Sequence, residues 1–318
     1  MVVCGFLSSQ TSIYNPELSV EYTQRRLYKL LGLNSWQWLF MIVSLIQIGT
    51  IGGLTYYQFE QNDVLSSSLV INIIVSVIIG FGLVTVSRGI FFDRQYDIRL
   101  YMLMMLLGTF YIAIEFLFTI EYQTNVLKMV RLIISSSLTI FLVSISKMIH
   151  RYSHEYEIVG VSNALIKLYQ TQTLFLSLLN FDLLLGIILS IFNLSLRPDD
   201  DFAQQKYTIM IIVIIYSFFQ WAIGKFAVIK EIKCLVLFYV ILYTASLLWT
   251  PLQFIYLNLC FTMSCTLDQL LLTTASLMSA FIILINRILI HIQMMKVHRN
   301  FGYGLADQAF IDLSLIHI

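Results

Sequence analysis

The chain has 318 residues, of which 58% are hydrophobic and only 12% are charged, and its formal net charge is +1. Soluble domains carry about 25% charged residues, and a water-soluble fold of this length could not bury so much apolar surface. The composition therefore predicts an integral membrane protein, and the near-zero net charge gives no indication of a nucleic-acid partner.

Residues 1–35 are predicted to form a cytoplasmic segment that contains one surface helix. Asn15 can cap this helix, Pro16 suits its first turn, and Gly32 can end it. The helix is amphipathic and precedes Trp36, a residue type typical of the membrane interface. We therefore expect an N-terminal interfacial amphipathic helix that lies along the membrane, with an ordinary solvated helix as the alternative.

Eight stretches of the chain are long and apolar enough to cross a bilayer, which takes roughly 20 residues. They lie at about 36–58, 64–86, 98–120, 126–149, 172–195, 207–229, 234–256 and 269–292. The predicted fold is therefore an all-α membrane bundle of about eight transmembrane helices over residues 36–293. Residues 294–318 form a predicted cytoplasmic tail. Its final LSLIHI resembles translated sequencing-adaptor DNA, which leaves a sequence-assembly artefact open as the origin of these residues.

Lysine and arginine predict which side of the membrane holds the termini. Fifteen of the 19 lie in the N-terminal segment, after spans two, four and six, and at the C-terminal end, and the other four lie on the opposite side. Cytoplasmic loops carry the excess of basic residues in membrane proteins. We therefore predict cytoplasmic termini in the plasma membrane or an endomembrane of a eukaryote, with the mitochondrial inner membrane left open.

Two charges near the outer end of the spans predict an ion pair. An ionisable side chain in the bilayer costs on the order of 3 kcal/mol by insertion scales, so it should face protein or water. Glu115 lies about five residues before the end of the third span, and Arg131 lies about five residues into the fourth. At about 1.5 Å per residue, both lie roughly 8 Å below the same interface. The sequence therefore predicts that Glu115 and Arg131 pair.

Asp182 interrupts the apolar run LFLSLLNFDLLLGIILSIF, which spans Leu174–Phe192. At about 100° per residue, it falls on a stripe of small and polar residues that is typical of a buried helix face. The stripe consists of Gln172, Gly186, Ser190 and Asn193. Either Lys225 or Arg287 can reach Asp182 from another span. Such a pair can fix the order of the helices, which we favour, or Asp182 can carry a proton or a cation in a transport pathway.

Small residues predict where helices pack closely. The second span carries them at four-residue steps, a pattern typical of close helix contact. They are Ser68, Asn72, Ser76 and Gly80. In the fifth span, Gly186 and Ser190 have the same spacing. We therefore predict a packing face on both spans.

Two linkers of the chain have a similar plan. SRGIFFDRQYDIRLYML joins spans two and three, and IGKFAVIKEIKCLVLF joins spans six and seven. Each runs from an aromatic-containing span end through a short basic and acidic linker directly into the next span. The similarity indicates a duplicated four-helix unit in one orientation, although the excess of basic residues in cytoplasmic loops produces similar linkers by itself.

The chain offers little that is typical of a catalytic or cofactor site. None of the four cysteines forms a CxxC pair, so no zinc or iron–sulfur site is predicted. Cys260 and Cys265 share a short loop, where a disulfide and two free thiols are both open. His150 and His154 have i, i+4 spacing, which belongs more often to a solvated helix end than to a metal site. We predict no enzyme activity, no metal and no cofactor.

One segment resembles a known family. The shared pattern F-x-S-L-L-x-x-D corresponds here to Phe175, Ser177, Leu178, Leu179 and Asp182, within LYQTQTLFLSLLNFDLLLG. This segment resembles a recurring one in a broad eukaryotic family of multi-pass membrane proteins of unknown function. The linker RGIFFDRQYDIRLYM also resembles the basic and acidic linker of that family. The resemblance implies an eight-span or similar bundle and carries no activity with it.

Two functions fit these features. The first is a non-enzymatic structural, accessory or assembly component of a membrane complex, which contacts lipids and assembles with itself or with other membrane proteins. The second is a transporter or channel for a small solute or ion, with Asp182 in its pathway. A water-filled path that reaches Asp182 would favour the second function over the first.

Overall fold

The computed structural model describes residues 35–61, 67–91, 94–118, 122–152, 163–195, 203–263, 267–299 and 301. Every regular element in these residues is an α-helix. The helices are α2 (Ser35–Gln61), α3 (Ser67–Phe91), α4 (Gln95–Phe118), α5 (Tyr122–Tyr152), α7 (Asn163–Ser195), α8 (Ala203–Ile229), α9 (Lys233–Met263) and α10 (Leu267–Arg299). The predicted interfacial helix and the C-terminal LSLIHI lie outside the described residues.

All eight helices contain a stretch that is long and apolar enough to cross a membrane. The prediction of eight such helices is therefore confirmed. Their ends differ from the predicted spans: α7 begins at Asn163 rather than near residue 172, and α10 continues to Arg299, beyond the predicted 292. The hydrophobic pattern marks only the apolar part of a helix, whereas its backbone hydrogen bonds continue into polar ends.

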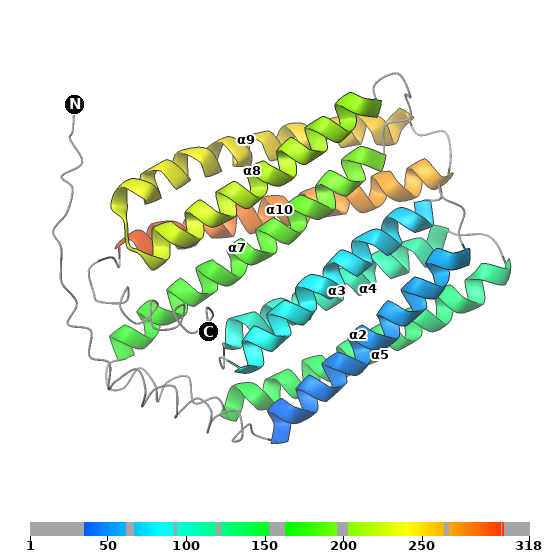
Figure 1. Cartoon of the computed structure of the whole chain (residues 1–318), viewed down its shortest axis with the longest axis horizontal. Coiled ribbons are helices and arrows are strands. Elements are labelled where there is room, and N and C mark those ends of the chain that lie inside the picture. The colour runs from blue at the N-terminus through cyan, green and yellow to red at the C-terminus, as the bar shows by residue number, and fades with distance from the viewer. Residues whose placement is uncertain are drawn as a thin grey trace.

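The helices form two four-helix units, α2–α5 and α7–α10, with the same connectivity (Figure 1). In each unit every helix packs against the next one along the chain, and the fourth packs back against the first. Successive helices run antiparallel, as in an up-down-up-down bundle. This shared connectivity is consistent with a duplicated four-helix unit, and a simple up-down bundle also produces it.

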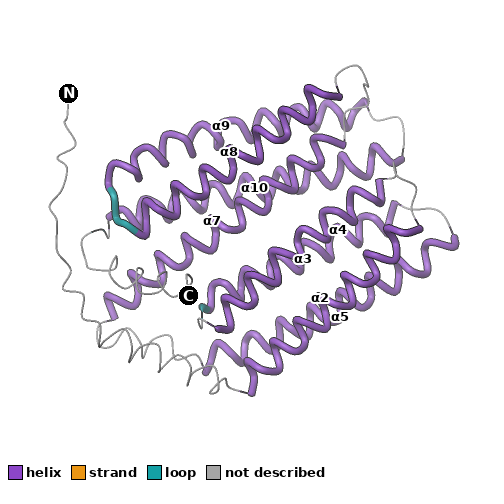
Figure 2. The backbone as a smooth tube through the Cα atoms, viewed as in Figure 1, coloured by secondary structure: helices purple, strands orange, loops and turns teal. Residues whose placement is uncertain are grey.

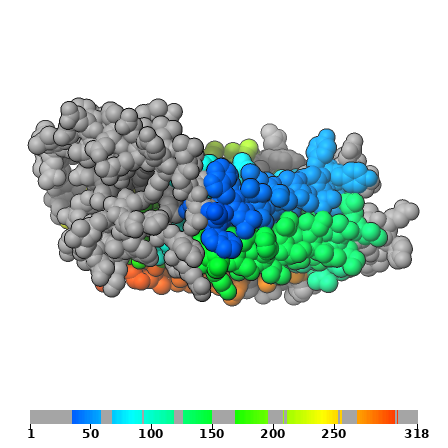
Figure 3. All heavy atoms as spheres, turned by 90° about the horizontal axis from the view of Figure 1, so that it is seen from below, coloured from blue at the N-terminus to red at the C-terminus, as the bar shows by residue number. Residues whose placement is uncertain are grey.

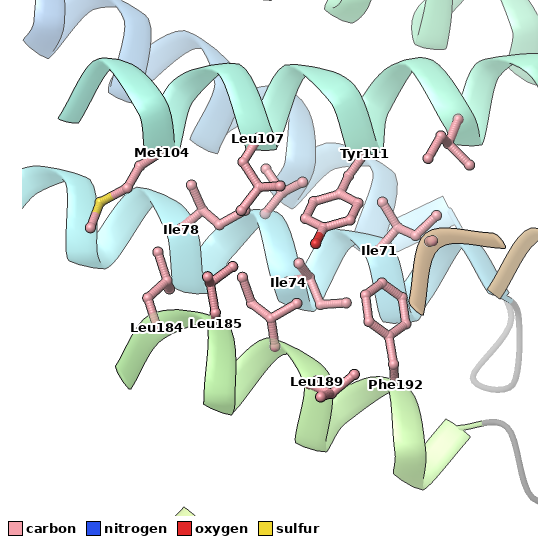
Figure 4. Close-up of a cluster of buried hydrophobic side chains, with 14 of the residues drawn as sticks. Ile71, Ile74, Ile78, Met104, Leu107, Tyr111, Leu184, Leu185, Leu189 and Phe192 are labelled. Atoms are coloured by element: carbon pink, nitrogen blue, oxygen red, sulfur yellow. The ribbon is translucent and has the colours of Figure 1, made fainter. Parts of the chain in front are cut away.

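The two units meet along α3 and α4 of the first and α7 and α10 of the second. These four helices contribute buried side chains to one apolar core (Figure 4). Tyr111 of α4 packs against Phe192 of α7, with 5.8 Å between ring centroids. The Tyr111 hydroxyl also lies 2.7 Å from the hydroxyl of Ser279 on α10. The units therefore share a continuous hydrophobic core.

Each unit also has a core of its own, built around an aromatic pair. In the first unit, Phe40 of α2 meets Tyr101 of α4 edge to face, at 5.9 Å and 73°. In the second unit, Phe175 of α7 meets Tyr239 of α9 in the same way, at 6.1 Å and 78°. The phenylalanine comes from the first helix of the unit and the tyrosine from the third. The two units therefore use the same helix positions for this contact.

The packing leaves α3, α4, α7 and α10 in the centre and α2, α5, α8 and α9 outside. In α7, 67% of the most apolar window is buried, against 28% in α8 and in α9. The outer helices expose large apolar side chains such as Ile215, Phe219 and Leu237. Figure 3 shows the face that α2 and α5 form on the first unit. Because exposed apolar faces of this extent are unfavourable in water, we expect them to contact lipid or another membrane protein.

The turns between α3 and α4 and between α8 and α9 close in a similar way. The N–H of Arg94 donates to the carbonyl of Gly89 at 2.9 Å, and the N–H of Ile232 donates to that of Ala227 at 3.2 Å. Such a bond over five residues is typical of the Schellman motif at a helix end. In the short α8–α9 loop (Figure 2), Glu231 has φ 49°, the left-handed conformation of that motif. The two linkers that are similar in sequence therefore also share a turn hydrogen bond.

Candidate functional site

A buried group of charges lies where α2 and α4 end and α3 and α5 begin. Glu115 of α4 contacts two cations of α5: its Oε1 lies 3.4 Å from Nζ of Lys128, and its Oε2 lies 3.5 Å from Nη1 of Arg131. The three side chains are at most 5% exposed. The structure brings Glu115 and Arg131 together at the depth where the sequence predicts their pair. Lys128 is a second cation that the sequence analysis did not assign to the site.

Neutral oxygens also contact the two cations, although Nε and Nη2 of Arg131 have no hydrogen-bond partner among the described residues. Nη1 of Arg131 donates to the side-chain oxygen of Gln58 on α2 and to Oδ1 of Asn72 on α3, the latter at 2.7 Å. Nζ of Lys128 donates to Oγ of Ser68 at 3.0 Å. We call these six residues the Glu115 cluster: Gln58, Ser68, Asn72, Glu115, Lys128 and Arg131. The cluster joins all four helices of the first unit, and its hydrogen bonds offset part of the cost of removing the charges from water.

Only half of the predicted packing face on α3 is buried. Ser68 and Asn72 point into the Glu115 cluster, whereas Ser76 and Gly80 are exposed. Among the described residues, nothing lies within 4 Å of a Cβ placed on Gly80. Ser76 and Gly80 turn away from the buried side because each four-residue step rotates the helix by about 40°, which amounts to about 120° after three steps. The glycines of α3 that approach α4 closely are Gly82 and Gly89 instead, where an added Cβ would lie 2.7 and 2.8 Å from a side chain of α4.

On α7, Gly186 and Ser190 are both buried. A Cβ added at Gly186 would lie 3.0 Å from Oγ of Ser217, so this glycine allows α8 to approach closely. Oγ of Ser190 donates to the carbonyl of Gly186 at 2.8 Å. Because α7 packs against α3, α4, α8 and α10, residues beyond the predicted stripe are buried as well. The stripe therefore marks only one of several packing faces on this helix.

Asp182 lies midway between Tyr169 and Ser195, the ends of the apolar span of α7. Its Oδ1 lies 3.5 Å from Nε of Arg287 and accepts a hydrogen bond from Nδ2 of Asn286 at 3.4 Å, both on α10. Both members of the ion pair have side chains that are 10% exposed. Of the two cations that the sequence leaves open, the structure places Arg287 at Asp182.

Arg287 also reaches the backbone of α9. Its Nη1 donates to the carbonyl of Ser246 at 2.7 Å and to Oγ1 of Thr250 at 2.5 Å. The next residue is Pro251, which lacks an N–H and so leaves the carbonyl of Leu247 without its helical donor. The guanidinium therefore binds α9 beside a gap in its hydrogen-bond ladder. We call these residues the Asp182 cluster: Asp182, Ser246, Thr250, Asn286 and Arg287.

Two stacked tyrosines of α9 lie beside the Asp182 cluster. The rings of Tyr239 and Tyr243 have centroids 5.2 Å apart and planes inclined by 21°. The Tyr243 hydroxyl lies near the Asp182 carboxylate, both tyrosines are at most 1% exposed, and neither hydroxyl has a hydrogen-bond partner among the described residues. Neither tyrosine was predicted from the sequence as a neighbour of Asp182. Their i, i+4 spacing at mid-span was the available signal, because it places two phenols on one helix face at the depth of Asp182.

Lys225, the other candidate partner of Asp182, contacts Trp221 instead. Its Nζ lies 4.8 Å from the centroid of the Trp221 ring, one turn earlier on α8, within the range of a cation–π contact. Nε1 of Trp221 in turn donates to Oδ1 of Asn180 at 2.8 Å. Lys225 lies near the end of α8, whereas Asp182 lies at mid-span, and a long basic side chain extends most favourably toward the interface.

A third ionic contact ties the α3–α4 turn to α7. Oδ2 of Asp97 lies 3.5 Å from Nη2 of Arg88, and its Oδ1 accepts a hydrogen bond from Oγ of Ser177 at 2.7 Å. Arg88 and Asp97 belong to the linker that resembles the eukaryotic family, and Ser177 belongs to the F-x-S-L-L-x-x-D pattern. The two segments that carry the resemblance therefore contact each other.

The remaining sequence candidates are not described. Cys265, the predicted disulfide partner of Cys260, and His154, the neighbour of His150, lie outside the described residues. Within the part of the chain that the structure describes, no group of three or more His, Cys, Asp or Glu residues is arranged to hold a metal ion.

Comparisons with protein-family models, with curated proteins and with solved structures give no match for this chain. The resemblance to the eukaryotic multi-pass family therefore stays a prediction.

Proposed function

We propose that this chain is a non-enzymatic structural or assembly component of a membrane, in which buried charges fix the arrangement of eight helices. The observation that supports this most is the number of helices that each buried carboxylate connects. The Glu115 cluster joins α2, α3, α4 and α5, and the Asp182 cluster joins α7, α9 and α10. Asp97 joins α3, α4 and α7, and thus the two units.

Buried ion pairs of this kind add little net stability, because removing both charges from water costs about as much as their attraction returns. Their better attested effect is on specificity: a wrong register or helix order would leave a charge unpaired in an apolar interior. In a protein whose helices are mostly apolar, the charges would contribute strongly to which helices become neighbours. The apolar outer faces of α8 and α9 would then contact lipid, a second copy or another membrane protein.

The alternative is a transporter or channel for a small solute or ion, and one observation favours it. Asp182 lies at mid-span beside Asn286 and near the Tyr243 hydroxyl, and intramembrane carboxylates with polar neighbours often mark a proton or ion path. In this reading, Asp182 exchanges a proton or a cation, and Arg287 is its counter-ion.

Stability of Asp182 variants in detergent tests the structural proposal. We expect D182N to lower the unfolding free energy, because Arg287 loses its carboxylate, and the double variant D182N/R287Q to recover part of that loss. K225Q is the matched control, since it removes a charge from α8 whose nitrogen lies over Trp221. A double variant less stable than D182N would contradict the proposal.

Flux through the purified protein tests the alternative. Wild-type protein and D182N are reconstituted into liposomes that contain a pH-sensitive dye, and proton and alkali-cation leak is measured after a pH or potassium jump. If the protein is a structural component, liposomes with wild-type protein should leak no faster than liposomes with D182N or empty liposomes. A wild-type flux that disappears in a fully folded D182N, and is retained in K225Q, would overturn the structural proposal and establish the transport pathway.

A further inference from the structure

The described helices form a row of four pairs: α2/α5, α3/α4, α7/α10 and α8/α9 (Figure 1). In the middle of the row, the second and third helices of the first unit, α3 and α4, pack against the first and fourth helices of the second unit, α7 and α10. One edge of each kind remains at the ends of the row. The α2/α5 edge consists of a first and a fourth helix (Figure 3), and the α8/α9 edge consists of a second and a third. The two ends therefore present the same kinds of edge that pack together in the middle.

The two units have the same orientation across the membrane. Because successive described helices run antiparallel, α2 and α7, the first and fifth of them, run in the same direction. Repeats in one orientation are related by an axis along the membrane normal, whereas inverted repeats are not. A second copy inserted in the same orientation can therefore place its α2/α5 edge against the α8/α9 edge, in the way that α7/α10 lies against α3/α4.

Contacts within each unit align the two units residue by residue. The edge-to-face aromatic pairs align α2 with α7 at Phe40 and Phe175, and α4 with α9 at their tyrosines. Each tyrosine follows the N–H donor of the preceding turn hydrogen bond by seven residues, so the turns give the same alignment. Gln47 and Asp182 each follow their phenylalanine by seven residues. Gln47 accepts a hydrogen bond from the tyrosine of α4 at 3.2 Å, and Asp182 lies near the tyrosine pair of α9.

The exposed face of α2 aligns with the face of α7 that packs against the first unit. Four side chains of α7 are buried in the core shared by the units (Figure 4), and they are Phe181, Leu184, Ile188 and Phe192. Their equivalents on α2 are all exposed, and they are Ile46, Gly49, Gly53 and Tyr57. The same helix face is therefore an interface in the second unit and an uncovered surface in the first.

The opposite end of the row shows the complementary relation. The side chains of α4 that contribute to the shared core include Leu100, Met104, Leu107 and Tyr111. Their equivalents on α9 are Phe238, Leu242, Ala245 and Trp249, of which all but the half-buried Leu242 are exposed. On α3, Val77 and Phe81 pack against this core, and their equivalents on α8, Ile215 and Phe219, are 62% and 53% exposed. The α8/α9 edge therefore carries the equivalents of an interface that is covered in the first unit.

We propose that a second copy of this chain docks on these edges, with α2/α5 of one copy against α8/α9 of the next. Within the chain, Tyr111 meets Phe192. The equivalent contact between copies joins Trp249 to Tyr57, which are 56% and 47% exposed. Among the described residues, nothing lies within 4 Å of a Cβ placed on Gly49 or Gly53, so α2 allows a close approach of the larger tryptophan.

This contact is heterologous, because the two copies contribute different surfaces to it. Each added copy leaves one edge of each kind uncovered, so the assembly grows into a row or closes into a ring. The inference rests on the proposed function for the location of the chain in a membrane, and it deepens that function by naming the partner.

Association measured by energy transfer in liposomes tests the proposal. Protein labelled with a donor or an acceptor at the C-terminus is reconstituted into phosphatidylcholine at several protein-to-lipid ratios. We expect I46A/Y57A on the α2 edge and F219A/W249A on the α8/α9 edge each to weaken association about tenfold or more. The four side chains are exposed, so the fold should persist. The matched control L103A/L106A changes two exposed leucines of α4 that belong to neither edge and should associate like wild type.

A mixture of the two variants distinguishes the heterologous contact from a symmetric one. I46A/Y57A keeps its α8/α9 edge and F219A/W249A keeps its α2/α5 edge, so the mixture should form dimers with wild-type affinity although neither variant associates well alone. Normal association of F219A/W249A alone, without recovery in the mixture, would indicate a symmetric α2-to-α2 contact and overturn the proposal.

Two further outcomes would also overturn it. No concentration-dependent transfer in wild-type protein would show that lipid covers both edges, and an equal loss in L103A/L106A would show that association is not specific to them. The structural role of the charges is tested separately by the stability of D182N and D182N/R287Q, so it stands or fails independently of these results.

Discussion

The buried carboxylates of the two four-helix units differ in their depth and in the number of their cationic partners. In the first unit, Glu115 lies near the helix ends and is shared by Lys128 and Arg131, all at most 5% exposed. In the second unit, Asp182 lies at mid-span with Arg287 as its cation. In both units the arginine makes its shorter contacts with neutral oxygens: Nη1 of Arg131 lies 2.7 Å from Oδ1 of Asn72, and Nη1 of Arg287 lies 2.5 and 2.7 Å from oxygens of α9, against 3.5 Å to each carboxylate. The units therefore differ in the number of buried cations that share the carboxylate, which is two for Glu115 and one for Asp182.

This difference shows that position in the membrane does not alone determine how much a charge matters. Asp182 is deeper, and by depth alone its loss would be the more costly. The number of cations left behind argues for the opposite order, because removal of one partner leaves an uncompensated buried charge. Substitutions in both units can therefore distinguish depth from partner count.

The largest expected effect follows from E115Q. This substitution leaves Lys128 and Arg131 buried together without a carboxylate, and we expect it to lower the unfolding free energy by roughly 3–5 kcal/mol. Denaturant titration in detergent, followed by circular dichroism, measures the change. The control is S76A on the exposed face of α3, which should stay within about 0.5 kcal/mol of wild type. A loss of less than about 1 kcal/mol in E115Q would show that the cluster does not depend on its carboxylate.

D182N should have a smaller effect of about 2 kcal/mol. Arg287 keeps its bonds to Ser246 and Thr250, and the asparagine side chain can still accept a hydrogen bond from Asn286. The same titration applies, so the two losses can be compared directly. A loss in D182N equal to or above that in E115Q would reverse the order and show that depth outweighs the number of cations.

Glycine substitutions compare the packing of the two units. In G224A, the new Cβ would lie 2.6 Å from Tyr239, a buried ring that stacks on Tyr243, so we expect a loss of roughly 1–3 kcal/mol. In G82A, the nearest atom at 2.7 Å is the end of the flexible Met105 side chain, which can move at a cost below about 1 kcal/mol. G80A, with open space around it, serves as the control and should be neutral or slightly stabilising. Thermal unfolding in detergent ranks the three variants, and equal losses in G224A and G82A would contradict the expected order.

The contrast between Glu115 and Ser177 shows what the sequence could and could not predict. Glu115 and Arg131 face each other across one short helical hairpin, so depth along neighbouring spans was enough to pair them. Ser177 and Asp97 are 80 residues apart. The periodicity within one helix shows which residues share a face, but it does not indicate which distant helix packs against that face. Asp182 is an intermediate case, because its buried environment was predictable, whereas the choice of Arg287 over Lys225 depended on the placement of α10 against α7. Spans follow from composition, but neighbours follow from packing.

The smallest expected effect concerns the turn that ends α8. Glu231 has φ 49°, and a residue with a Cβ is less stable by about 1 kcal/mol in this left-handed conformation than glycine is. E231G should therefore raise the unfolding free energy by up to about 1 kcal/mol, although glycine also gains some entropy in the unfolded chain. E231A separates the two possible causes, because it removes the carboxylate but keeps the Cβ. If only E231G is stabilised, the effect comes from the left-handed backbone conformation. If E231A gains the same unfolding free energy, the effect comes from the loss of the carboxylate, and backbone strain at Glu231 is excluded as its cause.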